Sequence, residues 1–285
     1  MKISTALNRL SFAKIFVWIL LIIMLFFTIL PLFFMITASF MQKNQILRMP
    51  YGWLPQPFHP RNYYQALRGN DGAWIFPRNI WNSLVVASVT ATTTVLLAAL
   101  TGYGLAKFRF RGRHLVFMMI MATMTIPFEA IMIPLYMVTR SLRIQNTYIG
   151  LILPFLVSAF GIFQMRQYLV TFPAEYLDAA RVDGMNEPGI FWKIVFPNCK
   201  PVIATLSILT FRSQWDNLLW PLLVIQSEKM KTIPLYITKF SEEKMTDEGA
   251  MMAAAAIASI PMFIMFFSLS KYFIGGSSVY DSRKG

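Results

Sequence analysis

Three charged residues lie in the interior of otherwise apolar runs of this chain, and their chemistry makes them the first candidates for a functional site: Glu129, Arg212 and Asp216. A charge in hydrocarbon is costly, so such residues usually pair with one another or line a pathway for a solute, an ion or a proton. Arg212, Asp216 and Trp220 recur every four residues, which predicts one stripe on a helix. The polar and aromatic residues beside that stripe complete the candidate substrate pathway: Gln214, Trp215 and Asn217.

Each of these charges also has a purely structural explanation. Arg212 and Asp216 can neutralise each other inside a helical bundle. Glu129 lies between Pro127 and Pro134, and its carboxylate can cap broken helical turns instead of contacting a solute. The residues alone leave both explanations open.

A second candidate is the charged, turn-rich segment EYLDAARVDGMNEPGIFWKIVFP, residues 175–197, which separates two apolar runs. Its first part predicts a short amphipathic helix. We expect the water-facing side of that helix to carry Glu175, Asp178, Arg181 and Asp183, and the packed side to carry Tyr176, Leu177, Ala180 and Val182. Gly184 is expected to end the helix, because glycine adopts the left-handed conformation at little cost.

A second helix is expected directly after this turn. Pro188 is favoured in the first turn of a helix, so we expect the chain to restart there and run toward Pro197. The segment is thus predicted to be a helix, a sharp turn and a helix.

The elements that must position these residues are long apolar runs. The chain has 285 residues, of which 56% are hydrophobic and only 14% charged, whereas about 25% charged is usual in soluble domains. Residues 15–36 carry no charge and exceed the ~20 residues that a helix needs to cross a bilayer. Further apolar runs cover 83–105, 115–138, 148–165, 202–225 and 252–273.

Backbone exposed to lipid must satisfy its own hydrogen bonds, so each run is expected to be a helix. The predicted fold class is therefore all-α: a polytopic integral membrane protein with six transmembrane helices, which places both termini on one side. The cluster KFRFRGR puts four cations directly after the second run, and cations favour the cytoplasmic side. We therefore expect an N-in, C-in topology, which explains the formal charge of +13 without nucleic acid.

This topology divides the chain into expected regions. Residues 1–14 form a cytoplasmic N-terminal segment, 15–273 the transmembrane domain, 166–198 a cytoplasmic loop within it, and 274–285 a cytoplasmic tail. The lone cysteine, Cys199, excludes an internal disulfide, and no residues near it have metal-ligand spacing. No G-x-x-x-x-G-K-[ST] segment occurs, so this chain is not expected to hold ATP phosphates by itself. We expect it to bind no cofactor and to be a non-catalytic subunit.

The spacing within the charged segment resembles a known motif. Asp178-Ala179-Ala180, three residues, Gly184, nine residues and Ile194-Val195-Phe196-Pro197 are similar to the EAA loop, E-A-A-x3-G-x9-I-x-L-P, of permease subunits in bacterial ATP-binding-cassette (ABC) importers. Asp178 replaces the glutamate of the pattern and Phe196 the leucine. Both changes are conservative.

The resemblance extends over nearly the whole chain. Segments similar to maltose-type, carbohydrate-uptake permeases of the shorter subunit class are GYGLAKFRFRGR, TIPFEAIMIPLY, WDNLLWPLLV and KYFIGGSSVYDSRKG. The resemblance implies a type I importer permease fold in the bacterial inner membrane. It implies that this chain forms half of a translocation pathway for a carbohydrate, an oligosaccharide, brought by an extracytoplasmic solute-binding protein. It also implies three further partners: a second, different permease and two copies of a P-loop ATPase that bind ATP and Mg.

In that family the EAA loop forms a coupling helix seated in a groove of the ATPase. The resemblance therefore implies an ATPase-coupling role for Glu175, Asp178, Ala179, Ala180, Asp183, Gly184, Met185 and Pro197. The last residues of relatives approach the ATPase, which makes 277–285 a further candidate contact.

Two alternatives remain at this stage. The first is an importer subunit of the same kind whose solute is a peptide or a polyamine, and the second is a different class of transporter. A self-sufficient secondary transporter would use Glu129 and Asp216 as ion or proton sites. It would transport its solute without ATP and without partner chains.

Overall fold

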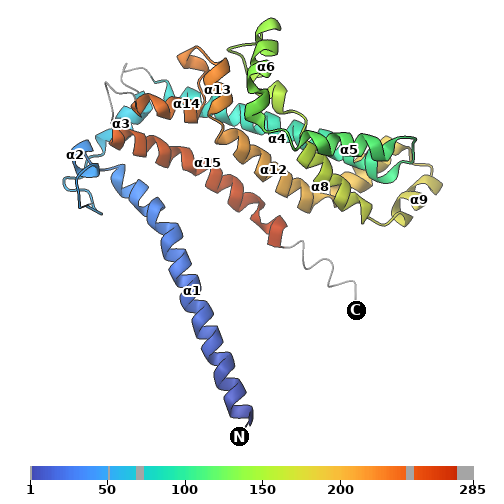
Figure 1. Ribbon diagram of the computed structural model, residues 1–285, viewed down its shortest axis with the longest axis horizontal. Coiled ribbons are helices and arrows are strands. Elements are labelled where there is room, and N and C mark those ends of the chain that lie inside the picture. Colours follow the sequence, from blue (N-terminus) through green and yellow to red (C-terminus); the bar gives the residue numbers. More distant parts are fainter. Residues whose placement is uncertain (1, 51, 69–73, 242–246, 275–285) are drawn as a thin grey trace. The chain divides into compact units, whose positions relative to one another are not determined.

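The computed structural model describes residues 2–50, 52–68, 74–241 and 247–274, and every described regular element is a helix (Figure 1). The C-terminal candidate contact, 277–285, lies outside these residues. The chain divides into two compact units, residues 1–74 with 239–258 and residues 75–238 with 259–285.

The first unit contains α1 (Lys2–Ala38), α2 (Lys43–Ile46), α3 (Arg61–Arg68) and the first part of α15 (Glu248–Ile274). Its small core consists of Ala38, Met41 and Ile46, with Phe34 and Met252 packed against them. The buried side chain of Asn62 donates hydrogen bonds to the carbonyl oxygens of Ser39 (3.0 Å) and Met41 (2.7 Å). These bonds tie α3 to the end of α1.

The apolar stretch of α1, Phe12–Ala38, has none of its apolar window buried within the chain. A helix that is apolar on all sides and uncovered by protein is suited to hydrocarbon. The apolar composition of α1 is therefore enough to predict that this helix contacts lipid.

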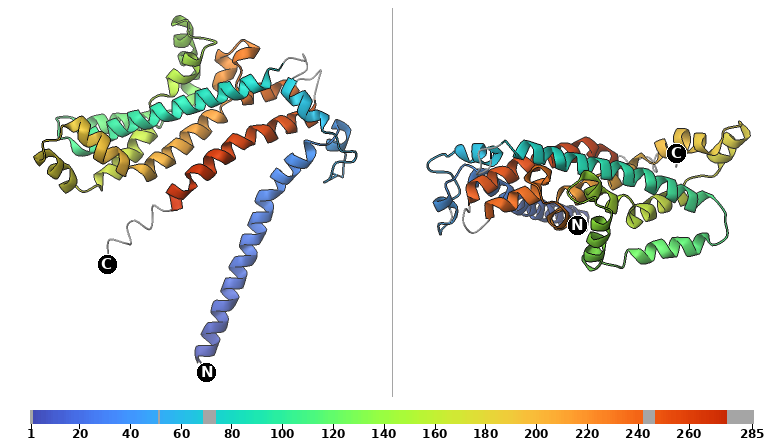
Figure 2. Two further views of the ribbon diagram at one scale, coloured as in Figure 1. Left: turned by 180° about the vertical axis from the view of Figure 1, so that it is seen from behind. Right: turned by 90° about the horizontal axis from the view of Figure 1, so that it is seen from above.

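The second unit is organised around α4 (Phe76–Lys107), which packs along α8 (Ala159–Val170) and α12 (Lys200–Trp215), as Figure 2 shows. The approach of α4 to α8 depends on Gly102, because a Cβ atom there would lie 2.6 Å from Cβ of Met165. Small residues at helix interfaces let backbones approach closely, which is how helices pack in membranes.

Shorter elements complete the second unit. They are α5 (Arg113–Thr123), α6 (Phe128–Ser141), α7 (Tyr148–Ile152), η1 (Leu153–Phe155), α9 (Glu175–Val182), α10 (Glu187–Ile190), the π-helix η2 (Phe191–Val195), α11 (Phe196–Asn198), α13 (Leu219–Val224), η3 (Glu228–Met230) and α14 (Ile233–Ile237); η4 (Thr238–Ser241) links to the first unit's residues. One buried cluster joins the end of α4 to α8, α9, α10 and α12. Another joins its start to α7, α13 and α14.

Three described helices are long and apolar enough to cross a membrane, and the number rises to six if each bent pair is one span. The bent pairs are Arg113–Thr123 with Phe128–Ser141 (96°), Tyr148–Phe155 with Ala159–Val170 (46°), and Glu187–Asn198 with Lys200–Trp215 (77°). The all-helical, polytopic class is thus confirmed.

The third, fourth and fifth apolar runs, however, are not the uninterrupted helices that we expected. Pro127 is extended (φ −65°, ψ 141°) and separates α5 from α6. Ser158 is also extended, and its hydroxyl accepts a hydrogen bond from the amide of Gly161 at the start of α8. In the fifth run α12 ends at Trp215, and α13 begins only at Leu219.

Candidate functional site

The charged segment folds as a short helix, α9, lying on the end of the second unit's core. Leu177 (1% exposed) and Ala180 (5%) are buried in the cluster that includes Tyr103 and Phe191. The expectation that Tyr176 and Val182 also pack is wrong, because their exposed fractions are 50% and 88%. Only one narrow stripe of α9 faces the core, since residues 177 and 180 lie on one side of the helix.

Gly184 ends α9 in the manner predicted. Its φ of +79° is left-handed. The amide of Gly184 donates to the carbonyl of Arg181 (3.0 Å), and the amide of Met185 donates to that of Ala180 (2.9 Å). These two bonds are the Schellman pattern that satisfies the last carbonyls of a helix. A Cβ atom at Gly184 would meet nothing within 4 Å, so the requirement for glycine within the chain is conformational rather than steric.

The second helix begins at Glu187, one residue before the predicted start. Asn186 caps it, because its side-chain oxygen accepts a hydrogen bond from the amide of Gly189 (2.9 Å). The chain continues through the π-helix, a conformation that is rare and often found at functional sites. It then reaches Cys199, which is buried with 1% of its surface exposed.

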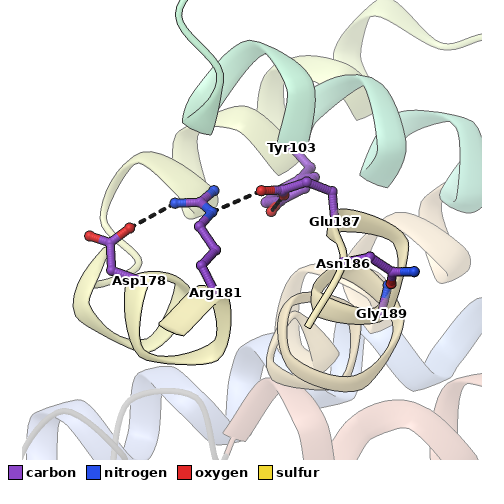
Figure 3. A network of polar contacts seen from close by, with 6 residues as sticks. All are labelled: Tyr103, Asp178, Arg181, Asn186, Glu187 and Gly189. Carbon is purple, nitrogen blue, oxygen red and sulfur yellow. Dashed lines mark hydrogen bonds and ion pairs between the residues drawn. The ribbon is translucent and has the colours of Figure 1, made fainter. Parts of the chain in front are cut away.

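The two helices are joined by a polar network around Arg181. Its Nη1 donates to Oδ1 of Asp178 (2.7 Å), and its Nε donates to Oε1 of Glu187 (2.8 Å). Figure 3 shows the guanidinium lying between the two carboxylates. The hydrogen bond to Glu187, followed by that to Asp178, raises the pKa of Arg181 above its ordinary value. The turn is therefore held by charge-assisted bonds as well as by backbone geometry.

The last turns of α4 hold this segment from the side of the core. The hydroxyl of Tyr103 donates to Oε2 of Glu187 (2.8 Å). One helical turn later, Nζ of Lys107 donates to the carbonyl of Phe172 (2.5 Å), two residues after the end of α8. Helix α4 is thus bonded both to the residues that lead into α9 and to the start of α10.

The residues predicted for ATPase coupling mostly lie on the surface of this segment. The exposed ones are Glu175, Asp178, Ala179, Asp183, Gly184 and Pro197, whereas Ala180 is buried and Met185 is partly buried. Sequence reasoning missed two polar partners of the site, Glu187 and Tyr103. The opposite charges of Arg181 and Glu187, six residues apart, were a signal for one of them.

The candidate pathway charges behave differently from one another. Arg212 Nε lies 3.5 Å from Asp216 Oδ2, and the side chains are 69% and 60% exposed. The pairing expected as a structural explanation is therefore present, but on the surface of the chain. Glu129 is exposed in the first turn of α6, where the positive end of the helix dipole favours a carboxylate.

The single stripe predicted for Arg212, Asp216 and Trp220 is wrong. Helix α12 ends at Trp215 and α13 begins at Leu219, so Trp220 is not on the helix of Arg212, and Trp220 is fully buried. Its Nε1 donates to the carbonyl of Gly150 (2.9 Å), and its ring packs edge-on against Phe128. The side-chain oxygen of Asn217 accepts a hydrogen bond from the backbone amide of Trp220 (3.3 Å). The other two residues of the predicted pathway, Gln214 and Trp215, are buried. Within the described residues, no group of His, Cys, Asp and Glu side chains could hold a metal ion.

Comparison with known proteins defines the class of this helical membrane protein. Residues 94–276, which include the whole of α9 and α10, match the family model described as "Binding-protein-dependent transport system inner membrane component". The chain belongs to this family, the permease subunits of binding-protein-dependent ABC importers.

Similar proteins and structures agree with this assignment. The arabinooligosaccharides transport system permease protein AraQ of Bacillus subtilis (strain 168) is 33% identical over 251 residues, which are 87% of this chain and 88% of that protein. The lactose transport system permease protein LacG of Rhizobium radiobacter is 38% identical over 200 residues, 70% and 73% of the two chains. A crystal structure of a bacterial ABC transporter involved in the import of the acidic polysaccharide alginate matches with a TM-score of 0.80 at 25% identity, covering 91% of this chain and 96% of that chain.

Family membership fixes the general role of the chain. It is a multi-pass inner-membrane protein with the ABC importer permease fold, and it is a non-catalytic component that binds no cofactor. Membership also implies ATPase and binding-protein partners. It favours the importer subunit over the alternative of a self-sufficient, ion-driven transporter.

Proposed function

We propose that this chain forms half of the translocation pathway of a carbohydrate importer, and that its solute is an oligosaccharide. It does so with a second, different permease, two copies of a P-loop ATPase and a solute-binding protein. The similar proteins support a saccharide, since two are permeases for arabinooligosaccharides and lactose and a third belongs to an importer of alginate. The solutes of these relatives differ in charge and size but share the chemistry of a saccharide.

The coupling site of this importer is the exposed face of α9. The observation that carries this proposal is that Val182 (88% exposed) and Tyr176 (50% exposed) stand on a helix whose turn and charges are firmly fixed. Exposed apolar side chains on a preorganised helix favour docking into a groove of another protein. Closure of the ATPases on ATP would then move α9 and shift the permease between inward- and outward-facing states.

The segment must lie in the cytoplasm for this to work. We place the cation cluster KFRFRGR and the charged segment on the same, cytoplasmic side of the membrane. The cations of KFRFRGR support this N-in, C-in topology. The outer side then carries the loops before α4 and after α13.

The test of the proposed function is a mild-detergent pull-down of the tagged chain from its native membrane, followed by mass spectrometry. We expect a P-loop ATPase and a second permease with an EAA loop to remain bound. Recovery of the chain alone, or with copies of itself only, would refute the proposal. Uptake by the chain alone, driven by a proton or sodium gradient after ATP depletion, would support the ion-driven alternative.

The solute pathway includes the exposed charges Glu129, Arg212 and Asp216. The pair Arg212 and Asp216 has no net charge and offers donors and acceptors together, which suits the hydroxyl groups of a sugar. A panel of labelled arabinooligosaccharides, lactose, alginate oligosaccharides and glycerol phosphate distinguishes neutral from acidic solutes.

Arg212→Gln is expected to lower uptake by about tenfold, the factor implied by losing one hydrogen bond to a charged group. The free energy of unfolding should change by less than about 1 kcal/mol, because exposed ion pairs contribute little. Uptake kinetics in vesicles and thermal unfolding in detergent measure the two effects. The control is Arg140→Gln, an exposed cation at the end of α6. Unchanged uptake in Arg212→Gln would assign the pair a structural role only.

A further inference from the structure

We propose that Tyr103 is the positioning residue through which movement of the docked α9–α10 segment reaches the membrane helices. The inference rests on the proposed function, in which that segment docks on the ATPase. Tyr103 lies on α4, 84 positions before Glu187 in the sequence, and the bond between them joins the segment to the core. Neither residue belongs to the set that sequence reasoning assigned to coupling.

The two oxygens of Glu187 have separate tasks. Oε1 accepts from Arg181 and so ties α10 to α9, whereas Oε2 accepts from Tyr103 and so ties α10 to α4. Figure 3 shows the side chains of Tyr103 and Glu187 meeting beside the guanidinium of Arg181. Removing the phenol hydroxyl therefore leaves the bonds within the segment intact and breaks the hydrogen bond between α10 and α4.

The ring of Tyr103 is fixed so that its hydroxyl cannot turn away. Only 5% of the residue is exposed. Its ring meets that of Phe108 edge-on (5.3 Å between centroids) and that of Phe191 at a tilt (5.7 Å). Phe191 begins the π-helix directly after α10, so ring contact and hydroxyl bond hold the same part of the segment. A contact immobilised in this way transmits displacement instead of absorbing it.

The helix that carries Tyr103 is suited to this task. It is continuous over Phe76–Lys107, while neighbouring candidate spans are broken. It packs along both α8 and α12, so a displacement at its cytoplasmic end is passed to two further helices. Lys107, four residues later on the same face, holds the carbonyl of Phe172 and gives the segment a second attachment to α4.

The test is Tyr103→Phe in the complete importer, reconstituted with its ATPase, partner permease and binding protein. The measured quantity is the number of solute molecules imported per ATP hydrolysed. We expect this ratio to fall by about fivefold or more, the lower end of typical coupling between sites, while ATPase binding in a pull-down stays at the wild-type level. Tyr103→Phe should lower the ratio by less in a Glu187→Gln background than in the wild type, because the two residues share one hydrogen bond.

The matched control is Tyr168→Phe. The hydroxyl of Tyr168 donates to the carbonyl of Asn198 (2.8 Å), at the other end of the segment from Glu187. We expect its ratio to remain that of the wild type. A wild-type ratio in Tyr103→Phe, an equal fall in both variants, or loss of the assembled complex in Tyr103→Phe would each overturn the proposal. Failure of the wild-type chain to bind the ATPase would instead refute the proposed function.

Discussion

Gly184→Pro is expected to reduce solute uptake to the background of membranes that lack the chain. The native φ of +79° is closed to proline, and proline also lacks the amide that donates to the carbonyl of Arg181. The turn between α9 and α10 must therefore open, which misplaces the exposed face of α9. Uptake of the labelled solute and recovery of the ATPase in a pull-down should be lost together, while the amount of chain in the membrane is unchanged.

Gly112→Pro is the matched control for this variant. Gly112 also has a left-handed backbone (φ +81°), a Cβ there would also meet nothing within 4 Å, and it lies between α4 and α5. Proline thus disturbs the backbone in a similar way at both positions, but Gly112 lies outside the charged segment, residues 175–197. We expect the ATPase to remain bound to Gly112→Pro. Full transport by Gly184→Pro would show that the turn is not needed for coupling.

Gly102→Ala is expected to destabilise the second unit by about 1–3 kcal/mol, the usual cost of overpacking. The new Cβ would lie 2.6 Å from Cβ of Met165 and 3.0 Å from the backbone nitrogen of Arg166. Because a backbone atom cannot swing aside, α4 and α8 must move apart. Thermal unfolding of the purified chain in detergent should show a lower Tm, with less protein recovered from the membrane.

Gly104→Ala is the control that separates the effect of close packing on stability from the effect of helix propensity. Gly104 is on the same helix, and a Cβ there would meet nothing within 4 Å. Both variants gain the benefit of alanine over glycine in a helix, at most about 1 kcal/mol, so their difference reports the contact alone. We expect Gly104→Ala to match or exceed the wild-type Tm. Equal stability of the two variants would mean that α4 and α8 do not approach closely at Gly102.

The helical class follows from the sequence because backbone groups in hydrocarbon must form hydrogen bonds within their own segment. The run at 15–36 needed no tertiary information, and it lies within α1. The breaks were harder to predict. Pro127 signals one of them locally. The interruption after Trp215 has no proline or glycine at the break itself, and its local feature is Asn217, whose side-chain oxygen accepts a hydrogen bond from the amide of Trp220 (3.3 Å). The error in the Arg212, Asp216 and Trp220 stripe has this origin.

In the charged segment, residues 175–197, the features that depend on local sequence were predictable. Gly184 and the helix restart near Pro188 depend on backbone preferences of a few residues, and both are present. The exposure of Val182 was not predictable from apolarity, because a surface made for a partner resembles a core stripe in sequence. The bond from Tyr103 to Glu187 joins residues far apart in the chain, and a single sequence contains no signal for such a pair.

The burial of Cys199 makes this chain a ready background for spectroscopic labels. It is the only cysteine, and with 1% of its surface exposed it is shielded from thiol reagents in the folded state. A cysteine introduced at exposed Ala179 would be the single accessible thiol of the native protein. A spin label or fluorophore there, paired with one on the ATPase, would follow the distance between the two chains through the transport cycle without a prior cysteine-free variant.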